Sequence, residues 1–359
     1  MNNGFSASLT GIHPFSEKTI QSIFDYKYGR ADKSKVVEEV EEDVRSLVVS
    51  EKGWKYVSTG NIGWQDLLRP FSDKLEGLER VSKIDDLPVT RNPLTNTFYR
   101  QPTVLGKISA KKGVLQSSKH SFLPDGVCQS RLLPQESKDK TWTQILPGPF
   151  YFAEMVKITP EGRKNYPSNV ACAEDFGQCL KGELSYLSNT GYASTIIDES
   201  PIVWAARIGK DSAEILQAEQ RILSDLQKSS RIPLIVHFFN GDILHKPKKS
   251  SETILEAILS SKVAGVGIDL INSSTEKVCE HNLGGKTIFA GLINAQGYSR
   301  QKNGSVVLED PKSIKESLLA IKDAGAGQIT LVPNTRMEFV PRSVADQKIQ
   351  LINKVIGGF

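Results

Sequence analysis

The chain has 359 residues, a length that suits one large α/β barrel with additions. Hydrophobic residues make up 39% of it and charged residues 24%, and the formal net charge is only +4. No basic stripe with interleaved aromatic residues is present, which argues against nucleic acid binding, and no apolar run is long enough to cross a bilayer. Because no signal-peptide pattern opens the sequence, we expect a cytoplasmic protein with neither a membrane nor a nucleic acid partner.

The first part of the chain has an irregular pattern. Segment 6–12 is predicted to be the first strand, 35–53 an acidic amphipathic helix and 54–60 the second strand. The region from about 71 to 142 is rich in loops and contains several prolines: Pro88, Pro93, Pro102 and Pro124. It shows no self-contained alternation of core elements. We therefore expect a single domain over 1–359, with a long excursion at about 71–142.

The second half alternates between short apolar strands and amphipathic helices. Strands are predicted at 192–198, 232–238, 264–271, 286–293 and 328–333, and helices at 211–230, 251–261, 310–325 and 343–356. Three of these helices carry start signals, at Asp211 or Ser212, at Ser251 and at Pro311, and Gly325 is a stop signal. This alternation predicts an α/β fold, a closed (β/α)8 TIM barrel. An open doubly wound sheet is the alternative, but the chain lacks G-x-G-x-x-G after its first strand.

Polar side chains gather at the predicted strand ends. In such barrels the functional residues lie at the carboxyl ends of the strands. Reading only those ends gives a short set of candidates: His13, Asn61, Asp198, Glu199, His237, Asp269, Asn294, Asn334, Thr335 and Arg336. We expect a polar cleft at this face that binds a small molecule.

The chemistry of this cleft is open at this point. A catalytic zinc site needs about three protein ligands; His237 and Asp269 are credible ones, but no cysteine falls at a strand end, so no bound metal is expected. His237 with Asp198 or Glu199 is a possible general acid–base pair if the hydrogen-bond geometry allows it. A Ser–His–Asp arrangement has no G-x-S-x-G support. The remaining interpretation is a polar histidine that is hydrogen-bonded to a neighbouring carboxylate.

Several motifs, taken together and in order, carry a resemblance to a known family. They are "GIHPFSEKTIQSIFDYKYGR" (11–30), "STGNIGWQDLLRPFSDKLEGLE" (58–79), "LPGPFYF" (146–152), "IIDESP" (196–201), "FAGLINAQ" (289–296) and "VPRSVADQKI" (340–349). The chain resembles the cobalamin-independent methionine synthase family, which has two related barrels of the type also found in uroporphyrinogen decarboxylase. The resemblance covers nearly the whole chain as one barrel.

The chain departs from the family at the residues that hold zinc. The catalytic barrel of the family binds zinc with a His-x-Cys pair, a Glu and a later Cys. Here His237 matches the histidine, Phe239 stands in the first Cys position, and the later Cys falls near Asn334 or Thr335. In the family, a Gly-Glu pair holds the amino group of homocysteine, and at the matching position this chain has Gly60-Asn61. The resemblance therefore implies that this chain binds no zinc.

The N-terminal barrel of the family also lacks zinc and carries a Thr-Asn-x-x-Tyr segment in a long loop. Here Thr95, Asn96 and Tyr99 match that segment, as a pterin or partner loop. The resemblance thus implies a split methyltransferase in methionine biosynthesis, with a methylated reduced pterin as methyl donor. A zinc-bearing barrel on a separate chain would be the partner, and this chain would be inactive alone. A non-catalytic binding scaffold and a zinc-independent stand-alone methyltransferase are the alternatives.

Overall fold

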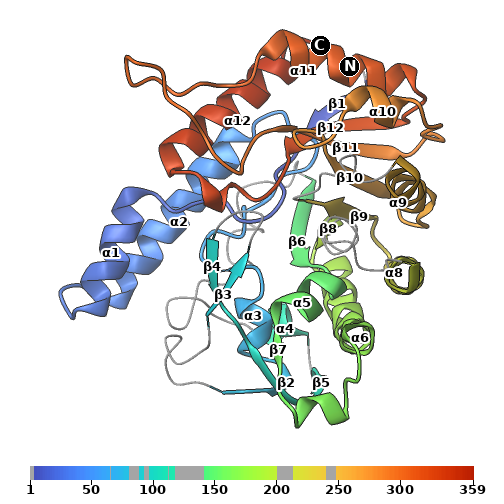
Figure 1. Ribbon diagram of the computed structural model, residues 1–359. Helices are drawn as coiled ribbons and strands as arrows, with labels where there is room; N and C mark the ends of the chain where they lie inside the picture. Colours follow the sequence, from blue (N-terminus) through green and yellow to red (C-terminus); the bar gives the residue numbers. More distant parts are fainter. Residues whose placement is uncertain are drawn as a thin grey trace.

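A curled parallel sheet forms the centre of the protein (Figure 1). The computed structural model describes residues 4–64, 66–80, 89–92, 97–111, 113–117, 141–199, 213–239 and 248–359. The sheet has seven strands in the order β1-β12-β11-β10-β9-β8-β6. Their bounds are Phe5–Ala7 (β1), Trp142–Pro147 (β6), Tyr192–Glu199 (β8), Leu234–Phe238 (β9), Gly265–Asp269 (β10), Thr287–Ile293 (β11) and Gln328–Pro333 (β12). Most strand residues are buried, as expected when helices cover a parallel sheet.

An eighth strand position lies between the two edges of this sheet. Val57 forms a single parallel bridge with Trp142 of β6. On the other side, the backbone N–H of Lys55 donates a hydrogen bond to the Ser6 hydroxyl of β1, at 3.0 Å. The predicted second strand, 54–60, is thus reduced to one bridge, and the positive φ values of Gly60 and Asn61 mark where its extended backbone ends. The predicted TIM-barrel fold class is confirmed.

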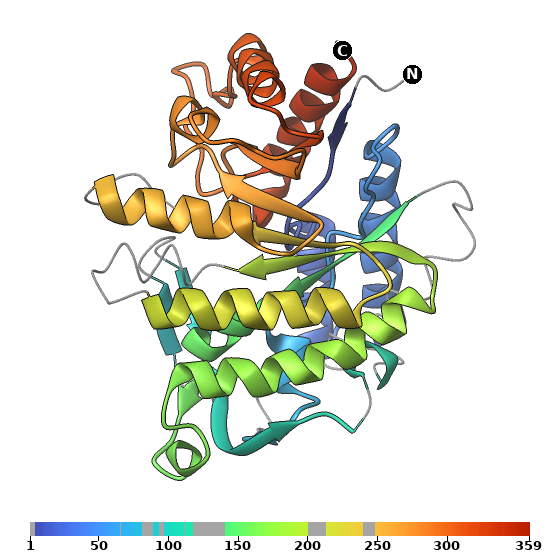
Figure 2. The same ribbon diagram turned by 90° about the vertical axis from the view of Figure 1, so that its right-hand side faces the viewer.

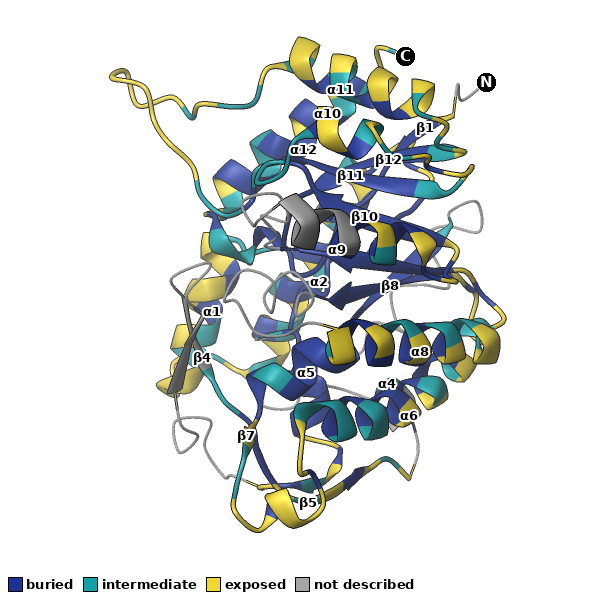
Figure 3. Cartoon of the chain, turned by 45° about the vertical axis from the view of Figure 1, so that its right-hand side comes forward, coloured by how far each residue is buried: buried dark blue, intermediate teal, exposed yellow. Residues whose placement is uncertain are grey.

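Amphipathic helices cover the outside of the sheet. Figure 2 shows three of them lying along one face, and Figure 3 shows that, where they are not grey, these helices have a buried side and an exposed side. These three are α6 (Asn169–Ser188), α8 (Ala213–Ser229) and α9 (Lys248–Ser260). The others are α1 (Glu17–Lys27), α2 (Lys33–Ser50), α5 (Pro149–Met155), α10 (Thr275–Cys279), α11 (Pro311–Asp323) and α12 (Arg342–Ile356). No helix among the described residues is long and apolar enough to cross a membrane.

The observed helix bounds confirm some of the predicted start and stop signals and contradict another. Pro311 opens α11 as predicted, and Gly325 follows its end with φ of +91°. Ser251 was wrong as a start signal, because α9 begins at Lys248 and Ser251 lies inside the helix. A serine specifies a helix start only weakly when the residues before it can also adopt helical geometry. The signals at Asp211 and Ser212 lie outside the described residues.

The region at about 71–142 holds short elements that pack beside the barrel. Their bounds are Arg69–Ser72 (α3), Glu76–Leu78 (β2), Val89–Asn92 (β3), Thr97–Arg100 (β4), Thr103–Ser109 (β5) and Val114–Ser117 (α4). β5 pairs with β2 and with β7 (Lys157–Ile158), and β3 pairs with β4. Glu183 of α6 accepts hydrogen bonds from the backbone N–H groups of Val114 and Leu115, which ties α4 to the barrel helices.

Candidate functional site

A buried histidine–carboxylate pair lies where β8 and β9 end. His237 and Asp198 are cross-strand neighbours in the parallel register, so their side chains leave the sheet on the same side. Nδ1 of His237 lies 2.9 Å from Oδ1 of Asp198, and neither residue is exposed to solvent. The two outer atoms, Nε2 of His237 and Oδ2 of Asp198, have no hydrogen-bond partner among the described residues. The geometry that an acid–base pair requires is therefore present.

A glycine and a phenylalanine lie next to the histidine ring. A Cβ on Gly267, the neighbour of His237 on β10, would lie 2.5 Å from Cδ2 of the imidazole, so only glycine leaves room for the ring. The ring of Phe239 is nearly parallel to the imidazole, at 16° and a centroid distance of 6.4 Å. The imidazole therefore packs directly against the backbone of β10.

Glu199 points to the opposite side of the sheet from Asp198. Its carboxylate accepts the backbone N–H groups of Phe150, at 3.0 Å, and Tyr151, at 2.6 Å, in the first turn of α5. Gly148 permits this approach, because a Cβ there would overlap the carboxylate. Burial, and then the nearby charge of Glu199, raises the pKa of the fully buried Glu219 well above its usual range. Glu199 thus anchors α5 and does not join the histidine pair.

Asp269 and Asn334 form a second polar group at the same edge of the sheet. Nδ2 of Asn334 donates to Oδ1 of Asp269 at 3.2 Å, and Oδ1 of Asn334 accepts the backbone N–H of Ala295 at 2.8 Å. Asn272 also donates to Asp269, from its side chain at 2.8 Å and from its backbone at 3.1 Å. The side-chain amide of Gln296 accepts from both asparagines. This network ties together the segments that follow β10, β11 and β12.

Asn61 and Asn294 have structural contacts of their own. Asn61 adopts a positive φ of 46°, and its side chain donates to the Ile145 carbonyl at 3.0 Å and accepts from Gln144 at 2.9 Å. The half-buried Asn294 donates its backbone N–H to Glu309, which also binds the buried Lys348 at 2.8 Å. Both asparagines fix loops at the strand ends.

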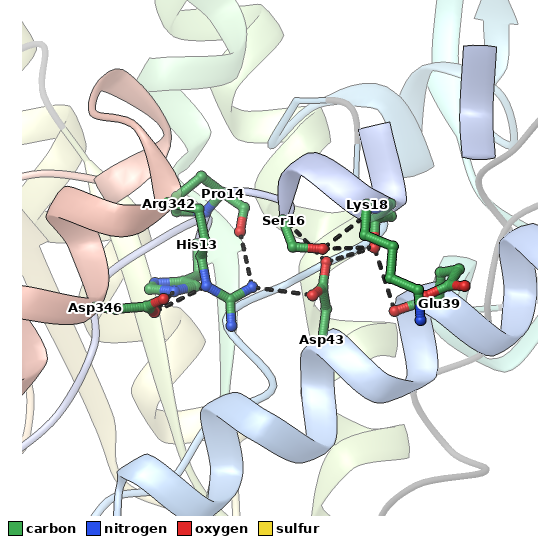
Figure 4. Close-up of polar contacts among 9 residues, drawn as sticks. His13, Pro14, Ser16, Lys18, Glu39, Asp43, Arg342 and Asp346 are labelled. Carbon is green, nitrogen blue, oxygen red and sulfur yellow. Dashed lines mark hydrogen bonds and ion pairs between the residues drawn. The ribbon is translucent and has the colours of Figure 1, made fainter. Parts of the chain in front are cut away.

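His13 lies in a separate network between the end of β1 and three helices (Figure 4). Nε2 of His13 lies 3.5 Å from the carboxylate of Asp346 on α12. Arg342 binds both Asp346, at 2.8 Å, and Asp43 on α2, at 3.3 Å, while Asp43 accepts from Thr19 on α1 at 2.7 Å. Burial lowers the pKa of His13. We interpret this network as a link between helices.

Arg336 is a fully buried cation at the end of β12. Its guanidinium carbon lies 4.8, 5.0 and 5.6 Å from the ring centres of Phe239, Tyr151 and Phe339. Nη1 donates to the hydroxyl of Tyr151 at 2.9 Å, and Nε lies 3.0 Å from the carboxylate of Glu338. Cation–π contacts stabilise a desolvated guanidinium by about 2 kcal/mol or more. Sequence reasoning placed Arg336 at the strand end but gave it no role.

A glycine after β1 permits this burial of Arg336. Gly11, after β1, has φ of +79°, and a Cβ there would lie 1.9 Å from Cγ of Arg336. The side chain of Arg336 therefore runs across a position that only glycine can occupy. Gly11 is more than 300 residues away in sequence, so only the folded chain reveals the relationship.

The residues present do not fit zinc. Among the described residues, no group of three or more His, Cys, Asp or Glu side chains is placed to hold a metal ion. The carboxylate of Asp269 is already surrounded by amide donors. Phe239 brings a ring with a guanidinium on it close to His237, and a fixed positive charge opposes binding of a divalent cation. Cys172 and Cys179 are buried on α6, where burial raises the pKa of each thiol to about 12.

The loop residues proposed for a pterin or partner lie largely beyond what the structure describes. Thr95 and Asn96 fall outside the described residues, and for Tyr99 only the backbone of β4 is described. Their role stays a prediction.

No family model matches this chain, and no curated protein matches its sequence. Solved structures do share its fold. A B12-independent methionine synthase from Shewanella sp. W3-18-1, in complex with selenomethionine, is 15% identical with a TM-score of 0.72, over 98% of this chain and 97% of that one. A putative vitamin-B12-independent methionine synthase from Listeria monocytogenes is 13% identical with a TM-score of 0.64, over 99% of each chain. A methyltransferase from Methanosarcina mazei is 10% identical with a TM-score of 0.56, over 99% of this chain and 94% of that one. At these identities the likeness establishes a methionine-synthase-like barrel fold.

Proposed function

We propose that this chain is a methyltransferase barrel of the methionine-synthase type. It binds a small sulfur-containing amino acid at the carboxyl ends of its strands and takes the methyl group from a methylated reduced pterin. The observation that supports this most directly is the likeness over the whole length to the Shewanella protein, a chain of similar length in complex with selenomethionine. The proposed ligand is thus of a kind that a barrel of this fold and length accommodates.

The described side chains at this face suit such a ligand. Oδ2 of Asp198 is a buried acceptor without a hydrogen-bond partner among the described residues, and an ammonium group would satisfy it. Nε2 of His237, the other atom of the pair without a partner among the described residues, would meet the sulfur group. A buried polar atom left unpaired costs about 1–3 kcal/mol, so binding a ligand that pairs both atoms is favourable.

A split enzyme is the second candidate, and the aromatic ring at Phe239 favours it. Methyl transfer to sulfur needs a thiolate, because a free thiol is only slightly ionised at neutral pH. The ring of Phe239 lies beside His237 and carries the guanidinium of Arg336 on it, which speaks against zinc at this histidine. In this arrangement a separate zinc-bearing barrel supplies the thiolate, and the present chain contributes to binding of the pterin or of that partner.

One assay separates the two arrangements. Methionine formation from homocysteine and a methylated pterin is measured in chelator-treated buffer for this chain alone, and then with a zinc-bearing methionine synthase barrel from the same organism. Turnover by the chain alone supports the first arrangement. Turnover only in the mixture supports the split enzyme. No turnover in either case, while the partner is shown to hold zinc, contradicts a methionine-forming role.

A further inference from the structure

The buried pair of Asp198 and His237 has one feature that its structural role does not need. Packing and one hydrogen bond would hold the ring, yet Nε2 is left without a partner among the described residues, at full burial. An unpaired buried polar atom costs about 1–3 kcal/mol. A fold that keeps this cost at the carboxyl ends of barrel strands points to a ligand at Nε2.

The contact with Asp198 decides which ring nitrogen of His237 carries the hydrogen. A carboxylate accepts hydrogen bonds, so the N–H of the neutral imidazole lies on Nδ1 and faces Oδ1 of Asp198 at 2.9 Å. Nε2 then carries the lone pair. The hydrogen bond to Asp198 and the close approach of the ring to the Gly267 backbone keep this orientation.

We propose that Nε2 of His237 accepts the thiol proton of the methyl acceptor, with Asp198 stabilising the imidazolium that forms. The proton transfer replaces the role that a metal ion has in ionising a thiol. This proposal rests on the proposed function in one respect, namely that the acceptor is a thiol. It makes His237 a catalytic residue and Asp198 its positioning residue.

The reaction balances without a metal or a redox partner. The S–H bond breaks, its proton moves to Nε2, and the electron pair stays on sulfur. The thiolate attacks the methyl carbon of the pterin donor, so that an S–C bond forms as the C–N bond breaks. The leaving pterin nitrogen takes the proton from Nε2, which regenerates the neutral imidazole. Thiol and methylated pterin are consumed, and thioether and demethylated pterin are formed.

Thiolate formation on binding is a direct test. The full chain is titrated with homocysteine at neutral pH in chelator-treated buffer, and the ultraviolet absorbance of the thiolate is recorded against that of free homocysteine. We expect close to one thiolate per bound ligand for the wild type and none with methionine, which has no S–H. His237→Gln should bind homocysteine with no thiolate signal, and Asp198→Asn should reduce that signal at least tenfold.

Four further measurements make the test decisive. His281→Gln, a histidine on the turn after α10, serves as the control and should keep the full signal. Circular dichroism checks that each variant is folded, and ¹⁵N NMR of the imidazole in the wild type should show both ring nitrogens protonated in the homocysteine complex. Where methyl transfer is measurable, His237→Gln should slow it by about 100-fold or more.

The outcomes separate this proposal from the proposed function. Homocysteine that binds as the neutral thiol, or no saturable binding of it, overturns the proton-acceptor role. Methyl transfer that persists at the wild-type rate in His237→Gln also overturns it and leaves the methyltransferase function intact. A thiolate that forms at His237 but is never methylated would contradict the methyltransferase function alone.

Discussion

The guanidinium carbon of Arg336 lies 4.8 Å from the centre of the Phe239 ring, and that ring is nearly parallel to the imidazole of His237. A permanent positive charge is therefore separated from the histidine by one aromatic ring. Arg336 is fully buried, so solvent screens this charge poorly. Although Glu338 pairs with Arg336 at 3.0 Å, this charge works against a divalent metal ion beside His237.

The first prediction concerns zinc. We expect the purified chain, dialysed against metal-free buffer and then exposed to equimolar zinc, to retain much less than one zinc per chain. The physical reasons are the positive charge of Arg336 and the absence of thiolates beside His237 in the described residues. Atomic emission spectroscopy gives the ratio. A ratio near one that is lost in His237→Ala would show that the site holds zinc after all.

The second prediction concerns the aromatic surroundings of Arg336. Arg336→Lys should destabilise the protein by about 1–3 kcal/mol, because a lysine ammonium cannot stack on several rings while it also binds Glu338 and Tyr151. Urea unfolding measures the change. Arg300→Lys is the matched control, since the exposed Arg300 lies over the single ring of Tyr298, at 5.5 Å, and its replacement should stay within about 0.5 kcal/mol. Equal losses in the two variants would show that the burial of Arg336 adds no stability.

Sequence patterns located the strands of the barrel well where the pattern is local. The strand predicted at 328–333 is found at those bounds, because an apolar run there follows Gly327 and ends at Pro333. The second strand was predicted from its residues but forms only a bridge at Val57. The positive φ that ends this segment at Asn61 is not revealed by the sequence, because few asparagines adopt it.

The candidate site was predictable as a set of positions but not as a set of contacts. The parallel register that pairs Asp198 with His237 is decided by strand pairing, which residue patterns leave open. For the same reason, the sequence did not show which of the two neighbouring carboxylates contacts the histidine. The structure shows that Asp198 does, while Glu199 anchors α5. Arg336 was among the candidates, but its burial could not be predicted, because it depends on Gly11, at the opposite end of the chain.

The third prediction concerns the pH dependence of stability at Glu183. Burial raises the pKa of this carboxyl from 4.5 to about 7, against the hydrogen bonds from Leu115 and Val114. The folded state therefore binds more protons than the unfolded state between about pH 4.5 and 7, so stability falls as pH rises through this window. In Glu183→Gln the group cannot ionise. We expect the wild type to lose about 2–3 kcal/mol relative to this variant between pH 5 and pH 8.

Urea unfolding at several pH values tests this prediction. Glu161→Gln is the control, because Glu161 is exposed and pairs with Lys164 on the surface, and its difference from wild type should change little with pH. If the stabilities of wild type and Glu183→Gln follow parallel pH profiles, Glu183 titrates alike in the folded and unfolded states, and the account of its burial is wrong.

The last prediction concerns Gly267, which faces His237 across β10 and β9. The methyl group of Gly267→Ala would lie 2.5 Å from Cδ2 and 3.0 Å from Cα of His237, so the imidazole must move or the strands must separate. We expect a loss of stability of about 1–3 kcal/mol from this crowding. The shift of the ring should also weaken the contact with Asp198, and a misplacement of about 1 Å can reduce a catalysed rate about 100-fold. The measurements are urea unfolding and the thiolate signal with homocysteine.

Gly182→Ala is the matched control, because no atom outside the neighbouring backbone of α6 lies within 4 Å of its added methyl. At this position alanine should stabilise the protein by about 0.5–1 kcal/mol. A Gly267→Ala variant with unchanged stability and a full thiolate signal would mean that the imidazole does not occupy the position on which the proton-acceptor role depends.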